Sequence, residues 1–445
     1  MSETSAAQPI NSHPITPDTV RAALPGIADY IEGIAGFVEA SPSSYHAVDA
    51  AARLLVRAGF EEVDERAHWE RTEAGAGSFV RRDGALIAWI AGEGVGPTSP
   101  VRLLGAHSDS PTFKLKPGPG HTAEGWAQAG VEVYGGPLIN SWLDRDLCLA
   151  GRLVTHDGSE HLARTSPVAR IPQLAIHLDR TSNTALELDK QRHTQPILGI
   201  GEIDPVELLS TAAGVERDDI VGWDVFLADT QAPARIGASG ELLASGRLDN
   251  LSSVYAGLIA LALATPAADT IAILAVFDHE ELGSESRSGA AGPFLEDVLD
   301  RIQAGLGATT EDAARARAAS WCLSADAGHA VHPNYPEKHD PDVRPRAGAG
   351  PILKVNANQR YASDAHGAAL WARVCAAGAV PVQEFVSHNK VPCGTTIGPL
   401  TATRLGIRTV DVGVPLLSMH SARELAHVDD LHGLARAAAA FFAGA

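Results

Sequence analysis

Cysteine is scarce in this chain of 445 residues, which contains only Cys148, Cys322, Cys375 and Cys393. No two of them stand at the CxxC spacing of a thiolate zinc knuckle, so that class of metal site is excluded. Four cysteines in a chain of this length do not make a disulfide scaffold either. The low count favours a reducing compartment, and we predict a cytoplasmic protein whose cysteines are buried small side chains.

Long apolar runs are also missing. The longest ones, residues 254–264 and 271–277, are shorter than the ~18 residues that a membrane-spanning helix needs. Residues 1–19 have neither the basic lead nor the apolar core of a secretory signal. We therefore expect neither a membrane partner nor a secretory signal.

Basic residues are fewer than acidic ones. Lysine and arginine number 35 against 54 aspartates and glutamates, which gives a net charge of -19. This balance argues against nucleic-acid partners and anionic membranes, and any anionic substrate must meet a local positive site. The hydrophobic fraction of 45% is typical of a globular protein, and the length suggests two or three domains at one per ~150 residues.

Several common catalytic motifs are absent. The chain has no GxxxxGK[ST] phosphate loop, no GxGxxG dinucleotide fingerprint and no GxSxG nucleophile elbow. His279 and Glu280 begin like HExxH, but Gly283 stands where the second histidine would be. Nucleotide, serine-hydrolase and zincin chemistry are therefore unsupported.

Hydrophobic periodicity predicts an α/β fold. We expect two helices within residues 27–58 and strands at 86–90 and 101–105. After residue 246 the chain alternates between helices (251–264, 289–304, 310–319, 364–377 and one after Asp430) and strands (271–277, 321–324 and 407–412). This order favours a mixed sheet covered by helices on both faces.

The stretch from 111 to 240 differs from the rest. Glycine and proline are frequent there, and short β-like segments such as 131–134, 147–154 and 171–178 dominate, with one helix near 206–213. We interpret it as an inserted, mostly β domain. Residues 1–110 and 241–445 would then form the catalytic domain.

His107 and Asp109 form the first of five clusters of acidic and histidine residues. They follow a predicted strand, and in an extended chain they project to the same side. One of them can bind a metal while the other orients it. The alternative is a surface loop with a stray histidine.

The other clusters carry the same residue types. They lie at residues 247–250, 277–284, 323–329 and 418–424. Alternatives are helix caps at 247–250 and solvated or capped turns at the others. Ser421 and Glu424 have capping-box spacing, which predicts a helix start that holds His420.

Taken together, the clusters indicate a metal centre. Four of them lie just past the carboxyl ends of predicted strands, where open α/β sheets bind ligands. The candidate ligands are His107, Asp249, Glu281, Asp326 and His420. Two imidazoles and three carboxylates suit two zinc ions with one carboxylate bridging. The remaining net charge of +1 would acidify a bridging water and attract a peptide carbonyl.

The chain resembles the M18 family of metallo-aminopeptidases, the aspartyl aminopeptidases. The resemblance rests on motifs that follow one another along almost the whole chain. They are 41–48 (SPSSYHAV), 107–111 (HSDSP), 247–250 (RLDN), 278–284 (DHEELGS), 324–334 (SADAGHAVHPN), 354–356 (KVN), 359–362 (QRYA), 392–399 (PCGTTIGP) and 419–421 (MHS).

The resemblance implies a role for each candidate. One zinc would be bound by His107, Asp249 and Asp326, and the other by Asp249, Glu281 and His420, with Asp249 bridging. Glu280 would be the general base for a metal-activated water that attacks the peptide carbonyl, and Asp109 would orient His107. Lys354 would read the acidic side chain of the substrate's first residue. Carboxylate-rich sites of this kind also accept Mn²⁺ or Co²⁺.

The resemblance also bears on assembly. It implies dimers built into a dodecamer, a zinc-exopeptidase-like catalytic domain, and a dimerisation or lid role for residues 111–240. His177 would reach the active site of a neighbouring subunit and assist catalysis and substrate binding there. From the residue pattern alone, His177 is a polar residue on an alternating strand.

We therefore expect an aminopeptidase that removes N-terminal Asp or Glu from peptides with two zinc ions per subunit. One alternative is a related dizinc exopeptidase or amidohydrolase that prefers neutral residues. The other is a metal-stabilised shell or cargo protein without enzymatic activity. The presence of Glu280 together with all five candidate ligands argues against the non-enzymatic alternative.

Overall fold

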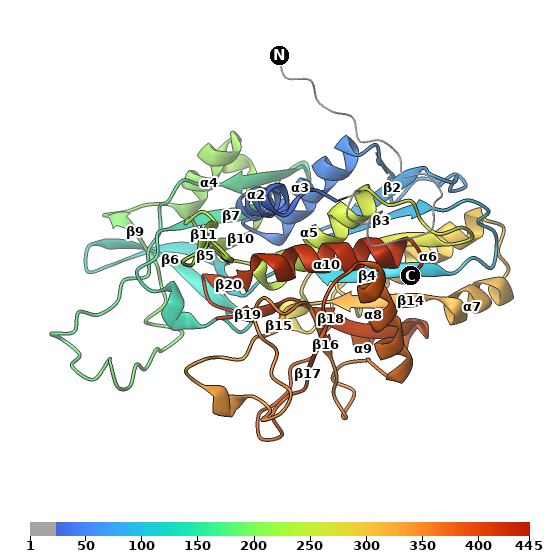
Figure 1. Cartoon of the computed structure of the whole chain (residues 1–445). Coiled ribbons are helices and arrows are strands. Elements are labelled where there is room, and N and C mark those ends of the chain that lie inside the picture. The colour runs from blue at the N-terminus through green and yellow to red at the C-terminus, as the bar shows by residue number, and fades with distance from the viewer. Residues whose placement is uncertain (1–23) are drawn as a thin grey trace, which may run out of the picture.

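A computed structural model describes residues 24–445, with a nine-stranded mixed sheet at its centre (Figure 1). The strand order is β1 (Glu61–Glu62), β2 (Gly77–Arg82), β3 (Ala85–Ala91), β13 (Ile271–Phe277), β4 (Val101–His107), β14 (Trp321–Ala325), β18 (Arg408–Gly413), β16 (Ile352–Lys354) and β17 (Gln383–Phe385). The four central strands, β13, β4, β14 and β18, are parallel to one another. Our expectation for residues 1–19, and the first part of the predicted domain 1–110, lie outside the described residues.

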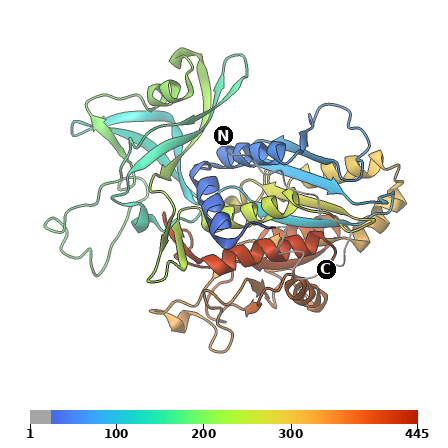
Figure 2. The same ribbon diagram turned by 45° about the horizontal axis from the view of Figure 1, so that its top comes forward.

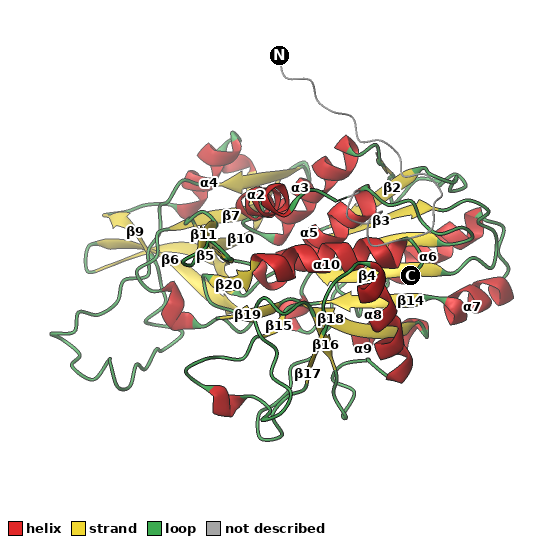
Figure 3. Ribbon diagram, in the orientation of Figure 1, coloured by secondary structure: helices red, strands yellow, loops and turns green. Residues whose placement is uncertain are grey.

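Helices cover both faces of this sheet, which confirms the predicted fold class (Figure 3). One face packs against α2 (Ile27–Glu39), α3 (Ser44–Arg57), α5 (Leu248–Ala262), α8 (Ala365–Ala377) and α10 (Val428–Phe442). The other packs against α6 (Phe294–Gly305) and α9 (Ile397–Leu405). A further helix, α7 (Thr310–Ala319), leads into β14.

The sequence of strand β13, IAILAVF, is apolar throughout because both faces of the strand are covered. Leu274 and Val276 belong to the core on one face, and Ile273 and Phe277 belong to the core on the other. All seven residues of the strand are buried. A strand that is covered on both faces has no polar side, so an unbroken apolar run is the expected pattern.

A separate six-stranded antiparallel sheet is built from residues 112–229 (Figure 2). Its order is β8 (Glu160–Arg164), β7 (Leu147–Thr155), β10 (Ile220–Asp229), β5 (Thr112–Ala123), β6 (Trp126–Tyr134) and β9 (Ile197–Ile200). Its apolar core includes Val206 and Leu209 of α4 (Pro205–Ala213), the helix predicted there. The division into domains at residues 111 and 240 stays a prediction.

A small five-stranded sheet joins segments that are far apart in the sequence. Its order is β11 (Ala234–Ile236), β12 (Leu242–Ser245), β20 (Glu424–His427), β19 (Pro415–Leu417) and β15 (Gly328–His329). Since β12 leads directly into Asp249 and β19 leads to His420, this sheet brings those two residues near each other.

One predicted helix start and one predicted strand were wrong, and one helix was missed. The helix predicted from residue 289 begins at Phe294, because residues 285–292 form turns ahead of Pro293. Helix α9 was missed, although Thr396 caps its start and Gly406 ends it at φ +66°. Its Gly398-Pro399 pair resembles a turn, but proline is tolerated in the first turn of a helix.

The other wrong prediction is the strand at 171–178. Only Ile171 makes a β-bridge, to Leu143, and residues 172–196 form a long loop with turns. His177 lies in a turn of this loop rather than on an alternating strand. Among residues 24–445, no helix is long and apolar enough to cross a bilayer.

Gly413, at the end of β18, offers a test of the close packing beside the strand ends. A Cβ atom there would overlap the backbone carbonyl of Asp326. We expect Gly413→Ala to lower the free energy of unfolding by about 1–3 kcal/mol, as for other overpacked sites, in urea titrations. Gly36 is the control, because it lies in α2 with nothing within 4 Å, so Gly36→Ala should raise it by up to ~1 kcal/mol. Equal effects of the two substitutions would contradict the packing argument.

Candidate metal centre

The parallel strands of the central sheet bring three candidate ligands to one edge. His107 ends β4 and stands in register with Phe277, the last residue of the neighbouring strand β13. Glu280 and Glu281 follow β13 in a short 3-10 turn, and Asp326 follows β14 on the other side of β4. The predicted grouping at the carboxyl ends of strands is what the structure has.

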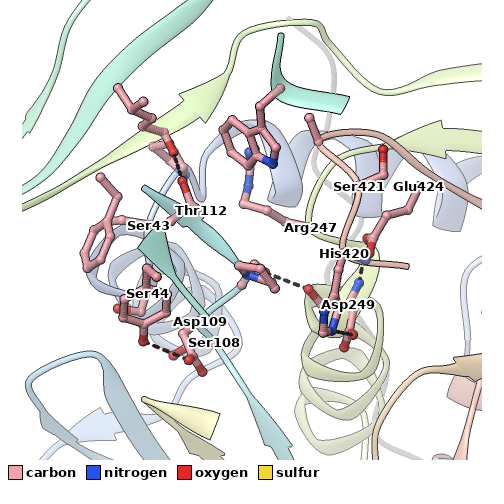
Figure 4. A pocket seen from close by; sticks show the side chains of 18 residues that line it. Ser43, Ser44, Ser108, Asp109, Thr112, Arg247, Asp249, His420, Ser421 and Glu424 are labelled. Atoms are coloured by element: carbon pink, nitrogen blue, oxygen red, sulfur yellow. Dashed lines mark hydrogen bonds and ion pairs between the residues drawn. The ribbon is translucent and has the colours of Figure 1, made fainter. Parts of the chain in front are cut away.

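Asp249 and His420 approach the same place from the five-stranded sheet. Glu424 on β20 holds both of them, since its two carboxylate oxygens accept hydrogen bonds from the backbone N–H of His420 (2.8 Å) and of Asp249 (2.9 Å). Figure 4 shows these three residues side by side. The predicted capping box was wrong, because Glu424 lies in a strand and Ser421 in a turn rather than at a helix start.

The carboxylate of Asp249 lies between two imidazoles. Its Oδ1 is 3.4 Å from Nε2 of His107, and its Oδ2 is 3.4 Å from Nε2 of His420. Asp249 is 4% exposed, so both contacts lie away from bulk water. One carboxylate thus faces a different imidazole with each of its oxygens.

Asp326 lies beside His107, and Glu281 lies beside His420. Oδ1 of Asp326 is 3.6 Å from Nε2 of His107, and Oε2 of Glu281 is 3.5 Å from Nε2 of His420. Ligand atoms of His107, Asp249 and Glu281 all lie within 4.8 Å of one another, as a shared metal centre requires. All five candidate ligands are therefore brought together.

Two oxygen atoms in the cluster show that these residues fit metal ions. Oδ1 of Asp249 and Oε1 of Glu281 are buried and accept no hydrogen bond. Buried carboxylate oxygens are normally paired or bound to a metal, because burying them unpaired costs free energy. Imidazole nitrogens and carboxylate oxygens are ligand types that zinc accepts.

The charges of the cluster favour cations. Burial lowers the pKa of His420, but the neighbouring Asp249 and Glu281 outweigh it and raise the pKa to about 10. The same holds for His107. Burial lowers its pKa, but Asp109, Asp249 and Asp326 outweigh burial and raise the pKa well above the usual value. A divalent cation in the same place would replace these protons.

Asp109 organises the loop that carries the two glutamates. Its Oδ1 accepts a hydrogen bond from the backbone N–H of Glu280 (3.1 Å), and its Oδ2 accepts one from that of Glu281 (3.2 Å). The same carboxylate lies 3.4 Å from Nδ1 of His107. Burial raises the pKa of Glu280 to about 8, which is suited to a group that takes up and releases protons near neutral pH.

Lys354 lies beside the cluster and is 2% exposed. Its Nζ donates a hydrogen bond to the carbonyl oxygen of Ala327 (2.6 Å) and lies 3.4 Å from Oδ2 of Asp326. These two contacts use two of the three N–H donors of an ammonium group. His177, by contrast, is exposed in a turn of the loop 172–196.

Three residues that contribute to the centre were not predicted as part of it. Glu424 was assigned a capping role only, and neither Tyr134 nor Gly136 was considered. Tyr134 donates its O–H to Oδ2 of Asp109 (2.9 Å), and the carbonyl of Gly136 lies 2.9 Å from Nδ1 of His420. These two contacts span 25 and 284 positions in the sequence, so no local spacing signalled them.

The fold and this cluster define a metal-dependent hydrolase, and comparisons with known proteins identify the family. The family model for aminopeptidase I zinc metalloproteases (M18) matches residues 37–442. A probable M18 family aminopeptidase 2 of Streptomyces avermitilis is 53% identical over 425 residues, which cover 93% of this chain and 98% of that protein. Its counterpart in Stutzerimonas stutzeri is 43% identical over 93% of this chain and 98% of that protein.

Solved structures agree with these matches. A cryo-EM structure of an Ape4 and Nbr1 complex gives a TM-score of 0.89 at 33% identity, over 98% of this chain and 87% of that chain. The S. cerevisiae mApe1 dodecamer gives 0.82 at 30% identity, over 93% and 96%. The chain belongs to the M18 family, whose members are zinc-dependent aminopeptidases.

The central position of Asp249 can be tested by counting metal ions. We expect Asp249→Ala to lose zinc from both sides of the centre, because this carboxylate faces both imidazoles. Asp326→Ala, in contrast, should keep about one zinc per chain on the side of His420. The measurement is the number of zinc ions per chain after gel filtration, determined by elemental mass spectrometry. Unchanged zinc in Asp249→Ala would contradict the shared position.

Proposed function

We propose that the protein is a dinuclear-zinc aminopeptidase that prefers peptides beginning with Asp or Glu. The observation that carries this proposal is the buried Asp249 carboxylate, which faces His107 with one oxygen and His420 with the other. Together with the family membership, this arrangement supports two neighbouring metal sites and a hydrolytic reaction at the N-terminus of a peptide.

The ligands divide into two sets around Asp249. His107 and Asp326 would complete one site, because Nε2 of His107 faces both aspartates. Glu281 and His420 would complete the other. Mn²⁺ or Co²⁺ could take the same positions, since the donor set is mainly oxygen.

Glu280 is the proposed general base. When bound, zinc polarises the peptide carbonyl and makes water a better nucleophile at neutral pH. Glu280 would accept a proton from the attacking water and later deliver one to the leaving amine. Asp109 fixes the backbone of Glu280, so the base is held at a defined position relative to His107.

The preference for acidic residues rests on a cavity next to the centre. It has a volume of about 250 Å³ and lies between the segments 329–339, 385–394 and 416–419. No carboxylate side chain is among its lining residues, whereas His329, His332, Lys338, His339 and His388 are. Such a lining offers hydrogen-bond donors and one fixed positive charge to an acidic side chain.

Lys354 would add a second positive group for the same substrate. Its Nζ is 5.4 Å from the ring centre of Tyr361, which lines the cavity. Because Lys354 is already paired with Asp326, a second candidate is a dizinc aminopeptidase without acidic preference, in which Lys354 only holds that ligand. Substrate specificity decides between the two.

Assembly into a homo-oligomer fits the exposed loop 172–196. The side chains of Leu174, Ile176 and Leu178 are 62%, 43% and 75% exposed, which is unusual for neighbouring apolar residues. The related S. cerevisiae mApe1 structure is a dodecamer. We propose that a second copy covers this loop, that residues 111–240 serve assembly, and that His177 acts in the partner's active site.

Replacement of Glu280 tests the proposed base. We expect Glu280→Gln to keep its zinc, because the metal ligands stay, and to lower kcat about 10²–10⁴-fold through loss of proton transfer. Glu285→Gln is the matched control, since Glu285 is an exposed glutamate a few residues further on. Initial rates and zinc content are measured on the same samples. A Glu280→Gln enzyme with normal kcat would rule out this role.

Replacement of Lys354 tests the selectivity. We expect Lys354→Met to raise KM for peptides that begin with Asp or Glu about 10–100-fold, the cost of a lost charge-assisted hydrogen bond, and to change KM for Leu peptides much less. The measurement is a steady-state comparison of Asp, Glu, Leu and Lys substrates. If all substrates are affected equally, Lys354 only positions Asp326 and the acidic preference loses its main residue.

A further inference from the structure

We infer that the segment 134–141, which leaves the six-stranded sheet, is a built-in part of the metal centre, and that Tyr134 is a positioning residue for Asp109. This inference rests on the proposed metal centre but goes beyond it. The resemblance to the M18 family implied a dimerisation or lid role for residues 111–240. The contacts of 134–141 give this region a role in the geometry of the site itself.

The phenol of Tyr134 reaches the residue that organises the catalytic loop. Its O–H donates to Oδ2 of Asp109 at 2.9 Å. The same Oδ2 also accepts the backbone N–H of Glu281, at 3.2 Å. Without the phenol O–H, the Asp109 carboxylate would lose one of the donors that fix its rotation. Because Asp109 holds both glutamates and faces His107, that rotation sets the positions of base and ligand.

Packing fixes the direction of the phenol. Tyr134 is 6% exposed, and its ring lies edge-on to Phe226 of β10 at a centroid distance of 5.2 Å. Tyr45 of α3 lies on the same phenylalanine at 6.5 Å. The O–H of Tyr45 contacts Arg152 instead of Asp109. The two tyrosines therefore share one aromatic cluster but differ in what their O–H groups touch.

The residues after Tyr134 hold His420. The carbonyl oxygen of Gly136 accepts a hydrogen bond from Nδ1 of His420 (2.9 Å), and the backbone N–H of Leu138 donates to the His420 carbonyl (2.9 Å). A proton on Nδ1 leaves Nε2 unprotonated in a neutral ring, and Nε2 is the atom that faces Asp249 and Glu281. The segment thus selects the form of His420 that can bind a metal.

Gly135 brings the same segment against Glu281. A Cβ atom on Gly135 would lie 3.1 Å from Cβ of Glu281, which is tighter than an ordinary van der Waals contact, so a larger residue would push the two segments apart by a few tenths of an ångström. Gly135 also has φ +68°, a conformation that glycine adopts without strain. Segment 134–141 therefore contacts Asp109, Glu281 and His420. His107, in contrast, directs Nδ1 to the carbonyl of Asp109 on its own segment.

The test compares Tyr134→Phe with Tyr45→Phe, which removes the same atom from the same aromatic cluster. In the zinc-loaded full-length enzyme we expect Tyr134→Phe to weaken zinc binding or lower kcat by about 10–100-fold, as for other residues that orient metal ligands. KM should change little, because the cavity for the substrate is elsewhere. Tyr45→Phe should match the wild type. Zinc affinity is measured by competition with a chromogenic chelator, separately from activity.

The outcomes separate this inference from the proposed function. If the wild type binds zinc and is active but both tyrosine variants behave like it, segment 134–141 does not position the centre. A Tyr134→Phe enzyme with raised KM and unchanged kcat and zinc affinity would also overturn it. A wild type that binds no zinc would instead refute the proposed function.

A second pair of variants guards against a folding defect in Tyr134→Phe. Gly135→Ala places a methyl group against Glu281, whereas Gly125→Ala adds one at φ +82° with nothing within 4 Å. Both carry the same kind of backbone strain. We expect Gly135→Ala to bind zinc at least about tenfold more weakly than Gly125→Ala. Equal zinc affinities in these two variants would overturn the inference.

Discussion

The structure depends on one buried carboxylate that two imidazoles share. Asp249 can face both His107 and His420 only if the ends of the central strands and the turn after β19 meet at one point. The central sheet supplies His107, and the five-stranded sheet supplies the other two residues. Three carboxylates crowd this point, so the charge they concentrate needs cations or protons for compensation. This concentration of negative charge is what a site for metal ions requires.

The positions of His107, Glu281 and Asp326 could be predicted because they follow a local rule, whereas Asp249 and His420 come from the five-stranded sheet. Parallel strands end at the same edge of a sheet, so polar residues placed directly after apolar strands meet there. His107 and Asp326 follow this rule closely, since their strands are neighbours. The apolar run Ile271–Phe277 gave a strand with the predicted bounds, because a strand that is buried on both faces is apolar throughout.

The residues that hold the ligands could not be predicted in this way. Glu424 binds the backbone of Asp249 across 175 positions, and the carbonyl of Gly136 binds His420 across 284. Such contacts follow no sequence spacing, since they depend on how two sheets are placed. The strand predicted at 171–178 failed for a related reason. Its alternating apolar residues are exposed in this chain, so the alternation does not reflect the buried face of a strand.

A crystal structure of the zinc-loaded protein, with anomalous differences measured at the zinc absorption edge, would show whether two metal ions share Asp249. We expect two strong peaks on opposite sides of the Asp249 carboxylate, about 3.5–4 Å apart, one next to His107 and one next to His420. A single peak, or two peaks that leave Asp249 uncoordinated, would contradict a centre organised around this shared ligand.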